Sequence, residues 1–223
     1  MHKESKHILL LLGLTWFATG LSFAQDGYGT TFAAELAFPA GVFGESFKTG
    51  YGAHVDFYME SGSNLRLSVM FGFTRWGVDE AQINERYVAG GGKGTLQLEG
   101  RMNAFPLLLG VKLLSPPGGA RFYGLLEVGV YFFSGKVTGE KLDNGVVIQN
   151  IYEQKSNTVA GGNLGVGFLV PVGKDVSLDL AARYHLVKRD TYYNYDYSGN
   201  ATEVNTDKYF SLSVGVTYSF LAQ

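Results

Sequence analysis

Ten residues near the C-terminus, Ser211 to Phe220 (SLSVGVTYSF), alternate small or polar residues with apolar ones without interruption. Successive side chains of a strand point to opposite faces, so this stretch predicts a strand with one apolar and one polar face. Strands of soluble proteins usually run about 5 to 6 residues and carry Lys, Glu or Thr on the face that meets water. This run is longer, and its polar face has no charge. Which face meets water therefore decides the class of the protein.

The same alternation recurs along the chain and predicts eight strands in all. The other seven cover residues 31–38, 51–60, 65–76, 101–114, 122–133, 162–172 and 176–187. In each strand one register is apolar, as in Leu65, Leu67, Val69, Phe71 and Phe73, and the other holds Gly, Ser, Thr and scattered charges. No helix is predicted after residue 24.

The predicted connections alternate between short and long. SGSN, SPPGGA and GKD have the composition of tight turns. The remaining connections are much longer and include residues 134–161 and 188–207. Short turns and both termini are therefore expected at one end, and long loops at the other.

A closed barrel in a membrane explains the small, weakly charged polar face of these strands. In a soluble sandwich that face would be hydrated and would carry more charge. In an eight-stranded barrel the apolar register faces lipid and small side chains fill the narrow lumen. Closure also gives every backbone amide a hydrogen-bond partner in a neighbouring strand. This is necessary because hydrocarbon offers no partner of its own. Aromatics near strand ends fit interfacial girdles: Phe38, Tyr51, Trp76, Phe132 and Phe133 toward the long loops, and Phe122, Tyr218 and Phe220 toward the turns. The sequence thus predicts an all-β fold, a closed eight-stranded antiparallel up-and-down transmembrane β-barrel.

The N-terminus has the pattern of an export signal. MHKESKH is a basic segment, ILLLLGLTWFA is an apolar core too short to span a membrane as a helix, and Ser22-Phe23-Ala24 has small residues where signal peptidase cleaves. We expect residues 1–24 to be a signal peptide cleaved after Ala24 and residues 25–223 to form the barrel domain. A net charge of -2 and the absence of cysteine argue against nucleic-acid binding, disulfides and thiolate metal sites.

Placing the apolar register outward leaves a set of inward titratable residues. They are Glu35, His54, Asp56, Arg66, Lys112, Glu127, Asp179, Arg183 and His185. Counting along the strands puts Glu127 and Arg183 at similar depth, with Glu35 close. We expect Glu35, Asp56, Glu127 and Arg183 to form a structural ion-pair cluster, because an unpaired charge in a crowded lumen is costly. A narrow gated pore in which Arg183 changes partner is the alternative.

Three segments carry the resemblance to a known family: AFPLLLGVKLL, FYGLLEVGVYFFSG and FSLSVGVTYSF. Across residues 27–220 the chain resembles the small eight-stranded outer-membrane β-barrel proteins of Gram-negative bacteria, which include porin-family proteins. The resemblance implies that the last strand, ending at Phe220, is recognised by the barrel-assembly machinery, although Leu221, Ala222 and Gln223 follow it. It also implies contact with outer-membrane lipid and lipopolysaccharide.

Two short stretches partly resemble enzyme motifs, and the last long loop is rich in tyrosine. Outer-membrane lipid A deacylases have a Ser two residues after a His, whereas here the sequence reads His185-Leu186-Val187. In GGGKGT at residues 90–95, Lys93 is followed by Gly94 rather than by the Ser or Thr of a phosphate-binding loop, and the strand-loop-helix context of such a loop is not predicted. Tyr192, Tyr193, Tyr195 and Tyr197 lie in the last long loop and suit either contact with an external glycan or protein or a hairpin extension with aromatics at the interface, the interpretation we prefer.

The sequence therefore predicts a monomeric integral outer-membrane protein with a filled lumen and a structural or surface-interaction role through its long loops. The alternatives are a narrow channel for small or apolar solutes and a membrane-embedded lipid-modifying enzyme. We expect no catalytic, cofactor or metal site.

Overall fold

The computed structural model describes residues 25–188 and 206–220 and shows a closed antiparallel barrel. Each strand pairs with its neighbours in the sequence, and β8 pairs with β1 to close the sheet. The strands are β1 Gln25–Ala40, β2 Gly50–Ser61, β3 Leu65–Gly77, β4 Thr95–Leu114, β5 Arg121–Asp143, β6 Val146–Pro171, β7 Val176–Lys188 and β8 Thr206–Ser219. The up-and-down topology that the alternation predicts is confirmed.

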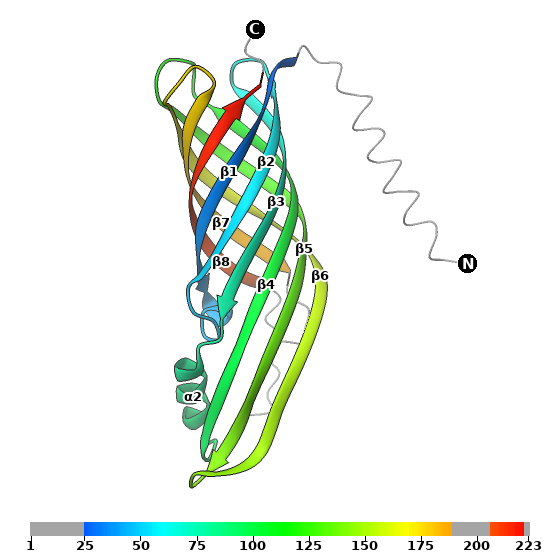
Figure 1. Cartoon of the computed structure of the whole chain (residues 1–223), viewed down its shortest axis with the longest axis vertical. Coiled ribbons are helices and arrows are strands. Elements are labelled where there is room, and N and C mark those ends of the chain that lie inside the picture. Colours follow the sequence, from blue (N-terminus) through cyan, green and yellow to red (C-terminus); the bar gives the residue numbers. More distant parts are fainter. Residues whose placement is uncertain (1–24, 189–205, 221–223) are drawn as a thin grey trace, which may run out of the picture.

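The two ends of the barrel differ as expected (Figure 1). Short turns join β2 to β3, β4 to β5 and β6 to β7 at one end, near Gln25 and Phe220. The longer connections lie at the opposite end, which we call the loop side. The connection between β7 and β8 includes residues 189–205, and the tyrosines predicted to make contacts there lie outside the described residues.

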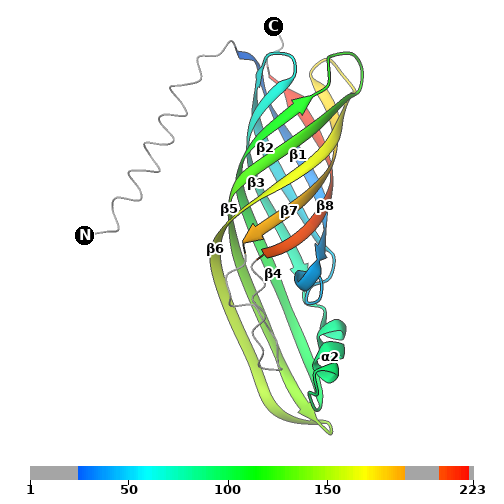
Figure 2. The same ribbon diagram turned by 180° about the vertical axis from the view of Figure 1, so that it is seen from behind.

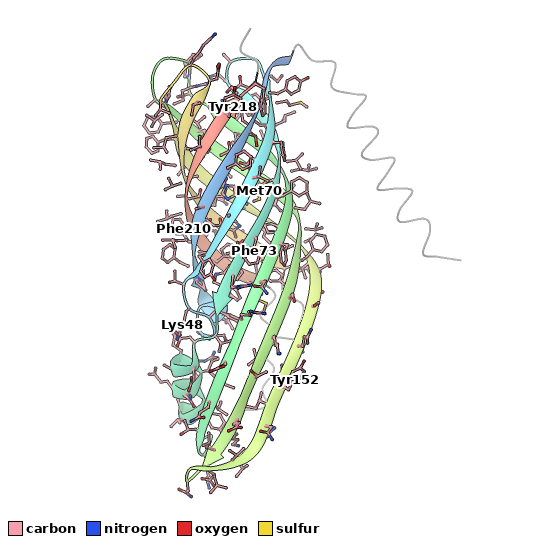
Figure 3. The ribbon with its side chains drawn as sticks, viewed as in Figure 1. Lys48, Met70, Phe73, Tyr152, Phe210 and Tyr218 are labelled. Carbon is pink, nitrogen blue, oxygen red and sulfur yellow. The ribbon has the colours of Figure 1, made fainter. Side chains whose placement is uncertain are left out.

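Side chains of the apolar register point away from the barrel axis, and the polar register points inward. In β8, Val214 is 57% exposed, whereas its neighbour Ser213 is 6% exposed. The predicted facing is confirmed, and Figure 3 shows the resulting shell of side chains around the strands. So continuous an apolar surface is rare on soluble monomers, whereas it is the normal outer surface of a barrel in lipid.

The outer face of β5 marks where this apolar surface ends. Outward residues from Phe122 to Phe132 are apolar apart from Gly124, and the next outward positions are Ser134 and Lys136. At about 3.3 Å per residue and a tilt of about 40°, the stretch from Phe122 to Phe132 is roughly 25 Å tall, the height of the apolar band of outer-membrane barrels. Ser134 and Lys136 therefore lie just outside the hydrocarbon on the loop side.

Residues 134–161 form no loop, and the prediction that they do is wrong. β5 and β6 continue as a hairpin until Asp143 pairs with Val146, and β4 joins them as far as Thr95 (Figure 2). The turn is Asn144-Gly145, with φ of 49° and 81°. Both values are positive, as a type I′ hairpin turn requires and as Asn-Gly accommodates. We call residues 95–100, 136–143 and 146–160 the loop-side sheet.

The prediction of no helix after residue 24 is also wrong. Helix α2, Glu80–Ala89, begins after Asp79, whose side chain accepts a hydrogen bond from the Gln82 backbone amide at 3.3 Å. The Asn84 side chain bonds both the amide and the carbonyl of Leu96, at 2.7 and 2.5 Å, and so covers the edge of β4 where its pairing with β3 has ended. A second short helix, η1, spans Gly41–Phe43. Within the described part of the chain, neither helix has the length and apolar content to cross a membrane.

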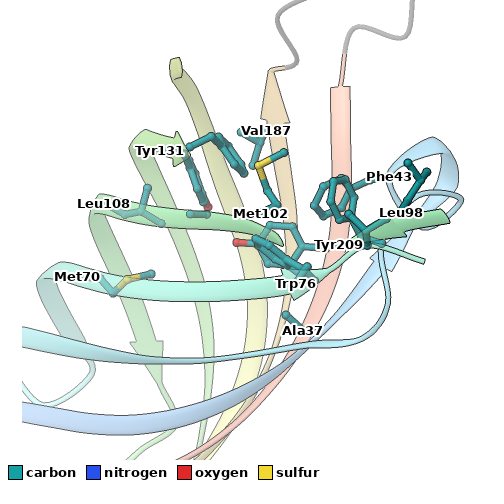
Figure 4. Packing of buried hydrophobic residues seen from close by; sticks show 14 of the residues in the cluster. Ala37, Phe43, Met70, Trp76, Leu98, Met102, Leu108, Tyr131, Val187 and Tyr209 are labelled. Atoms are coloured by element: carbon teal, nitrogen blue, oxygen red, sulfur yellow. The ribbon is translucent and has the colours of Figure 1, made fainter. Parts of the chain in front are cut away.

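An apolar cluster extends from the middle of the barrel through its loop-side mouth to α2 and the loop-side sheet (Figure 4). We call it the mouth cluster; its larger members are Phe43, Phe47, Met70, Trp76, Tyr87, Leu96, Leu98, Met102, Leu108, Tyr131, Phe133 and Tyr209. Trp76 and Phe133 point inward at 0% and 8% exposure, so their assignment to an interfacial girdle is wrong. Tyr51, Phe132, Phe122, Tyr218 and Phe220 are exposed on the outer face. Inward aromatics are possible because the lumen lies above the hydrocarbon here and must be closed against water.

Candidate functional site

All the titratable residues placed inward by the alternation do lie inside the barrel. Most are almost fully buried: His54, Asp56, Arg66, Lys112, Glu127, Asp179, Arg183 and His185. Glu35 is partly exposed as a residue, but only 7% of its side chain is exposed. They come from six strands, so their mutual contacts depend on how the closed sheet staggers those strands.

Asp56 on β2 lies between two cations. Lys112 Nζ of β4 is 2.7 Å from Asp56 Oδ2, and Arg183 Nη2 of β7 is 3.7 Å from the same oxygen. None of the three side chains is more than 3% exposed. The Asp56 carboxylate thereby compensates two buried positive charges, and Lys112 is a partner that the four-residue prediction omitted.

Arg183 also joins Asp56 to Glu127. Its Nε atom is 3.5 Å from Glu127 Oε2, and its Nη1 donates to Ser213 Oγ at 3.0 Å. Asn163 Nδ2 donates to the same Glu127 oxygen at 2.8 Å. We call Asp56, Lys112, Glu127 and Arg183 the lumen cluster.

Glu35 lies beside this cluster and has other partners. Thr74 Oγ1 donates to Glu35 Oε1 at 2.5 Å, and His54 Nδ1 is 3.8 Å from Glu35 Oε2. No ion pair between Glu35 and Arg183 is present among the described residues. Thr74 was not predicted because an inward threonine is indistinguishable in sequence from the small residues that merely fill a lumen.

The remaining inward charges are held nearer the turn side. Tyr123 OH donates to Asp179 Oδ1 at 2.5 Å, and Arg66 Nη2 is 2.6 Å from Glu60 Oε1. The Arg66 guanidinium also lies 4.3 Å from the centre of the Tyr58 ring. Polar and charged contacts thus continue along the lumen from the turn side toward the mouth cluster.

His185 contacts the mouth cluster rather than a carboxylate. Its Nε2 lies 3.0 Å from Ser211 Oγ, its Nδ1 lies 3.1 Å from Tyr131 OH, and its ring stacks on Tyr209 at 4.0 Å. His185 is 2% exposed and Ser211 0%, so both side chains are buried inside the barrel. Across residues 25–188 and 206–220 there is no group of three His, Asp or Glu placed to hold a metal ion.

Aromatic rings close the mouth above these polar groups. Trp76 packs edge-on against Tyr209 at 5.1 Å and against Phe43 at 5.2 Å, and Phe43 packs on Phe47 at 4.9 Å. Because Phe43 and Phe47 come from the β1–β2 connection, that connection folds into the mouth. The arrangement separates the lumen cluster from the loop-side solvent.

The glycine-rich stretch at residues 90–95 serves a structural purpose. Gly90 ends α2 by donating its amide to the Arg86 carbonyl at 2.9 Å, and the Lys93 carbonyl accepts from Tyr87 OH at 2.8 Å. The stretch follows a helix and leads into β4, the reverse of a phosphate-binding loop.

Comparison with known proteins finds solved structures of similar fold but no protein of similar sequence. No protein-family model matches the chain, and no curated protein matches its sequence. Among solved structures, Neisserial surface protein A is similar at a TM-score of 0.51 and 14% identity, over 88% of this chain and 99% of that one. A major outer membrane protein from Thermus thermophilus, at a TM-score of 0.48 and 18% identity, covers 86% and 99% of the two chains. The outer membrane protease OmpT from Escherichia coli, at 0.46 and 10%, covers 90% and 99%. The likeness to Neisserial surface protein A shows the fold, an up-and-down β-barrel, and the continuous apolar outer face of this chain fits a barrel that spans a membrane.

Proposed function

We propose that the barrel is a closed membrane anchor and that the loop-side sheet, with α2 packed on it, makes contacts outside the cell. Residues 1–24 would direct export and be cleaved after Ala24, and the last strand would be recognised by the barrel-assembly machinery. The anchored protein would be a monomer without catalytic activity. The loop-side sheet would hold its contact surface rigidly above the headgroups.

The closed lumen is the observation that carries this proposal. The lumen cluster and its hydrogen-bond partners fill the middle of the barrel, and Trp76, Tyr209 and Phe43 close its mouth. The interior of an eight-stranded barrel is just wide enough for side chains or for one small ligand, and here side chains occupy it. A solute would have to displace both the ion pairs and the aromatic rings to pass.

Planar-bilayer recording tests the anchor function. The purified wild-type protein is expected to give no reproducible unit conductance. Regular conductance steps that change in Glu127→Gln or Arg183→Met would contradict a closed anchor and favour a gated pore. Heat-modifiable gel mobility of each variant verifies that the barrel has folded before it is recorded.

A narrow polar pathway is the second candidate, and a specific observation favours it. Asp56 Oδ1, Glu127 Oε1 and Asn163 Oδ1 are buried and have no hydrogen-bond partner within the described residues. Buried oxygens of this kind usually bind water, so the lumen chemistry suits a short file of water molecules. If this is the function, Trp76→Ala should increase an existing wild-type conductance, because Trp76 blocks the mouth.

The inner face of the loop-side sheet supports the contact function. Val137 and Ile151 are partly exposed there and border a small hollow with the buried side chains of Phe47 and Leu98. Partly exposed apolar side chains outside the membrane are typical of binding surfaces.

A trimmed variant tests the contact function. Residues 138–152 would be replaced by Asn-Gly, which joins the paired residues Val137 and Glu153 by the same turn type. The barrel should keep its heat-modifiable mobility, and binding to an array of glycans and extracellular-matrix proteins should be lost. Equal binding by wild-type and trimmed protein in nanodiscs would contradict the proposal.

A further inference from the structure

The end of the β5–β6 hairpin carries a stretch of β6 that pairs with another strand of the described chain on one side only. Strand β6 pairs with β5 from Val146 onward, but its pairing with β7 begins only at Gly161. Residues 146–152, which read VVIQNIY, lie at the end of the loop-side sheet farthest from the barrel (Figure 1). We call residues 146–152 the tip edge, because one row of their backbone amides and carbonyls is left for a further strand.

The β7–β8 connection is too short to cover the tip edge. Seventeen residues separate Lys188 from Thr206, and the chain has to return to β8 within that length. A hairpin of this size has about seven residues on each arm, and Lys188 already lies one residue beyond the last β6–β7 pair. Even such a hairpin would end opposite Glu153, before the tip edge begins.

The opposite edge of the loop-side sheet is covered by the chain itself. The Val78 amide donates to the Gly100 carbonyl at 3.1 Å, and the Asn84 side chain bonds both backbone groups of Leu96. Natural proteins cover a strand edge or place charges on it, because an open edge pairs with other chains. The tip edge has neither a cover within the described chain nor a charge.

The side chains of the tip edge favour pairing with another strand. Its larger exposed side chains are Val146, Val147, Ile148 and Tyr152. Ile148 is the extra residue where the register between β5 and β6 shifts, so it has no residue opposite it on β5. The stretch contains no Pro and no Gly. Uncharged segments of this length, rich in β-branched residues, form stable contacts between strands of separate chains.

The tip edge is complementary to a second copy of itself. In an antiparallel pair with a two-fold axis at Gln149, Val147 of each copy lies opposite Ile151 of the other, and no charges face each other. Two barrels in one membrane hold β6 in the same direction, so an antiparallel pair requires a copy in an opposing membrane. The barrel therefore stays a monomer within its own membrane.

From these observations we infer that the tip edge joins this protein to a second copy in the membrane of a facing cell, by antiparallel pairing of the two β6 strands. The inference rests on the proposed contact function of the loop-side sheet and names the partner. Asp143 at the hairpin turn lies eleven residues beyond Phe132 on β5. At about 3.3 Å per residue and a tilt of about 40°, the turn lies roughly 28 Å above the apolar band. Two tips can thus overlap without contact between the barrels.

Tethering of lipid vesicles tests the inference. The full mature protein is reconstituted into two sets of vesicles with different fluorophores, and vesicle pairs that carry both colours are counted. Ile148→Lys should lower the number of tethered pairs roughly tenfold, because it replaces an apolar contact by cations that face each other across the two-fold axis. Ile148→Asp should have the same effect. Vesicles with Ile148→Lys should nevertheless tether to vesicles with Ile148→Asp, since the facing charges are then opposite.

Val88→Lys is the matched control. Val88 lies on α2 and is 58% exposed, close to the 54% of Ile148, so the same change there should leave tethering as in wild type. Heat-modifiable mobility verifies that each variant has folded.

Any of three results would overturn the inference: no tethering by wild type, equal tethering by wild type and Ile148→Lys, or tethering to vesicles that carry no protein. The last result would show that the tip inserts into lipid rather than pairing with a second copy. Binding of the same preparations to the glycan and matrix-protein array is measured in parallel. Loss of tethering with array binding retained contradicts self-pairing alone, whereas loss of array binding contradicts the contact function.

Discussion

At the scale of single residues, Val214 and Ser213 are neighbours in β8 that meet opposite environments. Val214 faces lipid near the middle of the band, and Ser213 faces the lumen and accepts from Arg183. Val214→Arg should lower the free energy of unfolding in lipid vesicles by about 2 to 4 kcal/mol, the cost of a mid-bilayer cation. Ser213→Thr keeps the hydroxyl and should have a small effect. Denaturant titration of both variants checks this, and equal losses would mean that the facing is reversed.

A second residue-scale prediction concerns the buried charges. Asp56→Asn leaves Lys112 and Arg183 short of one negative charge inside the barrel. Removing one member of a buried pair typically costs about 3 to 5 kcal/mol. Glu45→Gln breaks the exposed pair with Arg86, in which the two side chains are 44% and 49% exposed, and should cost less than about 1 kcal/mol. Unfolding by denaturant measures both, and a cost for Asp56→Asn no larger than that for Glu45→Gln would mean that the lumen pairs are hydrated and weak.

At the scale of elements, the Asn84 side chain joins α2 to the edge of β4 by two hydrogen bonds. Asn84 bonds both backbone groups of Leu96, so Asn84→Ala leaves that amide and carbonyl without partners. Hydrogen exchange should become faster in residues 80–98, while the unfolding midpoint of the barrel stays unchanged, since the helix lies outside the lipid-facing band. Gln82→Ala, an exposed change on the same helix, is the control and should leave exchange at Leu96 as in wild type.

At the scale of the whole molecule, the closed barrel determines how the protein behaves in cells. It should fractionate with the outer membrane, and unboiled samples should run faster on detergent gels than boiled ones, because a closed sheet resists detergent. Intact-mass measurement should give a mature chain beginning at Gln25. A protein recovered in the aqueous fraction without detergent would contradict the membrane placement.

The local sequence determined which face of every strand points outward. It did not predict the hairpin of residues 134–161 or helix α2, because both lie outside the membrane. The alternation is strict where one side meets lipid, as in residues 211–220. In the loop-side sheet both faces meet water or apolar cover, so the pattern weakens in residues 134–161, where only Asn144-Gly145 signals the hairpin. The Asp79 cap before EAQINERYVA was likewise a usable signal for α2 that alternation alone passes over.

The sequence by itself therefore determined that this chain is a lipid-facing barrel and which register of each strand faces the lumen, because alternate side chains along a strand meet lipid and the lumen. Only the tertiary structure decided that Asp56 meets Lys112 and Arg183, that Glu35 meets Thr74, and that Trp76 closes the mouth. Those contacts join strands far apart in the chain. The stagger with which the sheet closes sets them, and no single strand encodes that stagger.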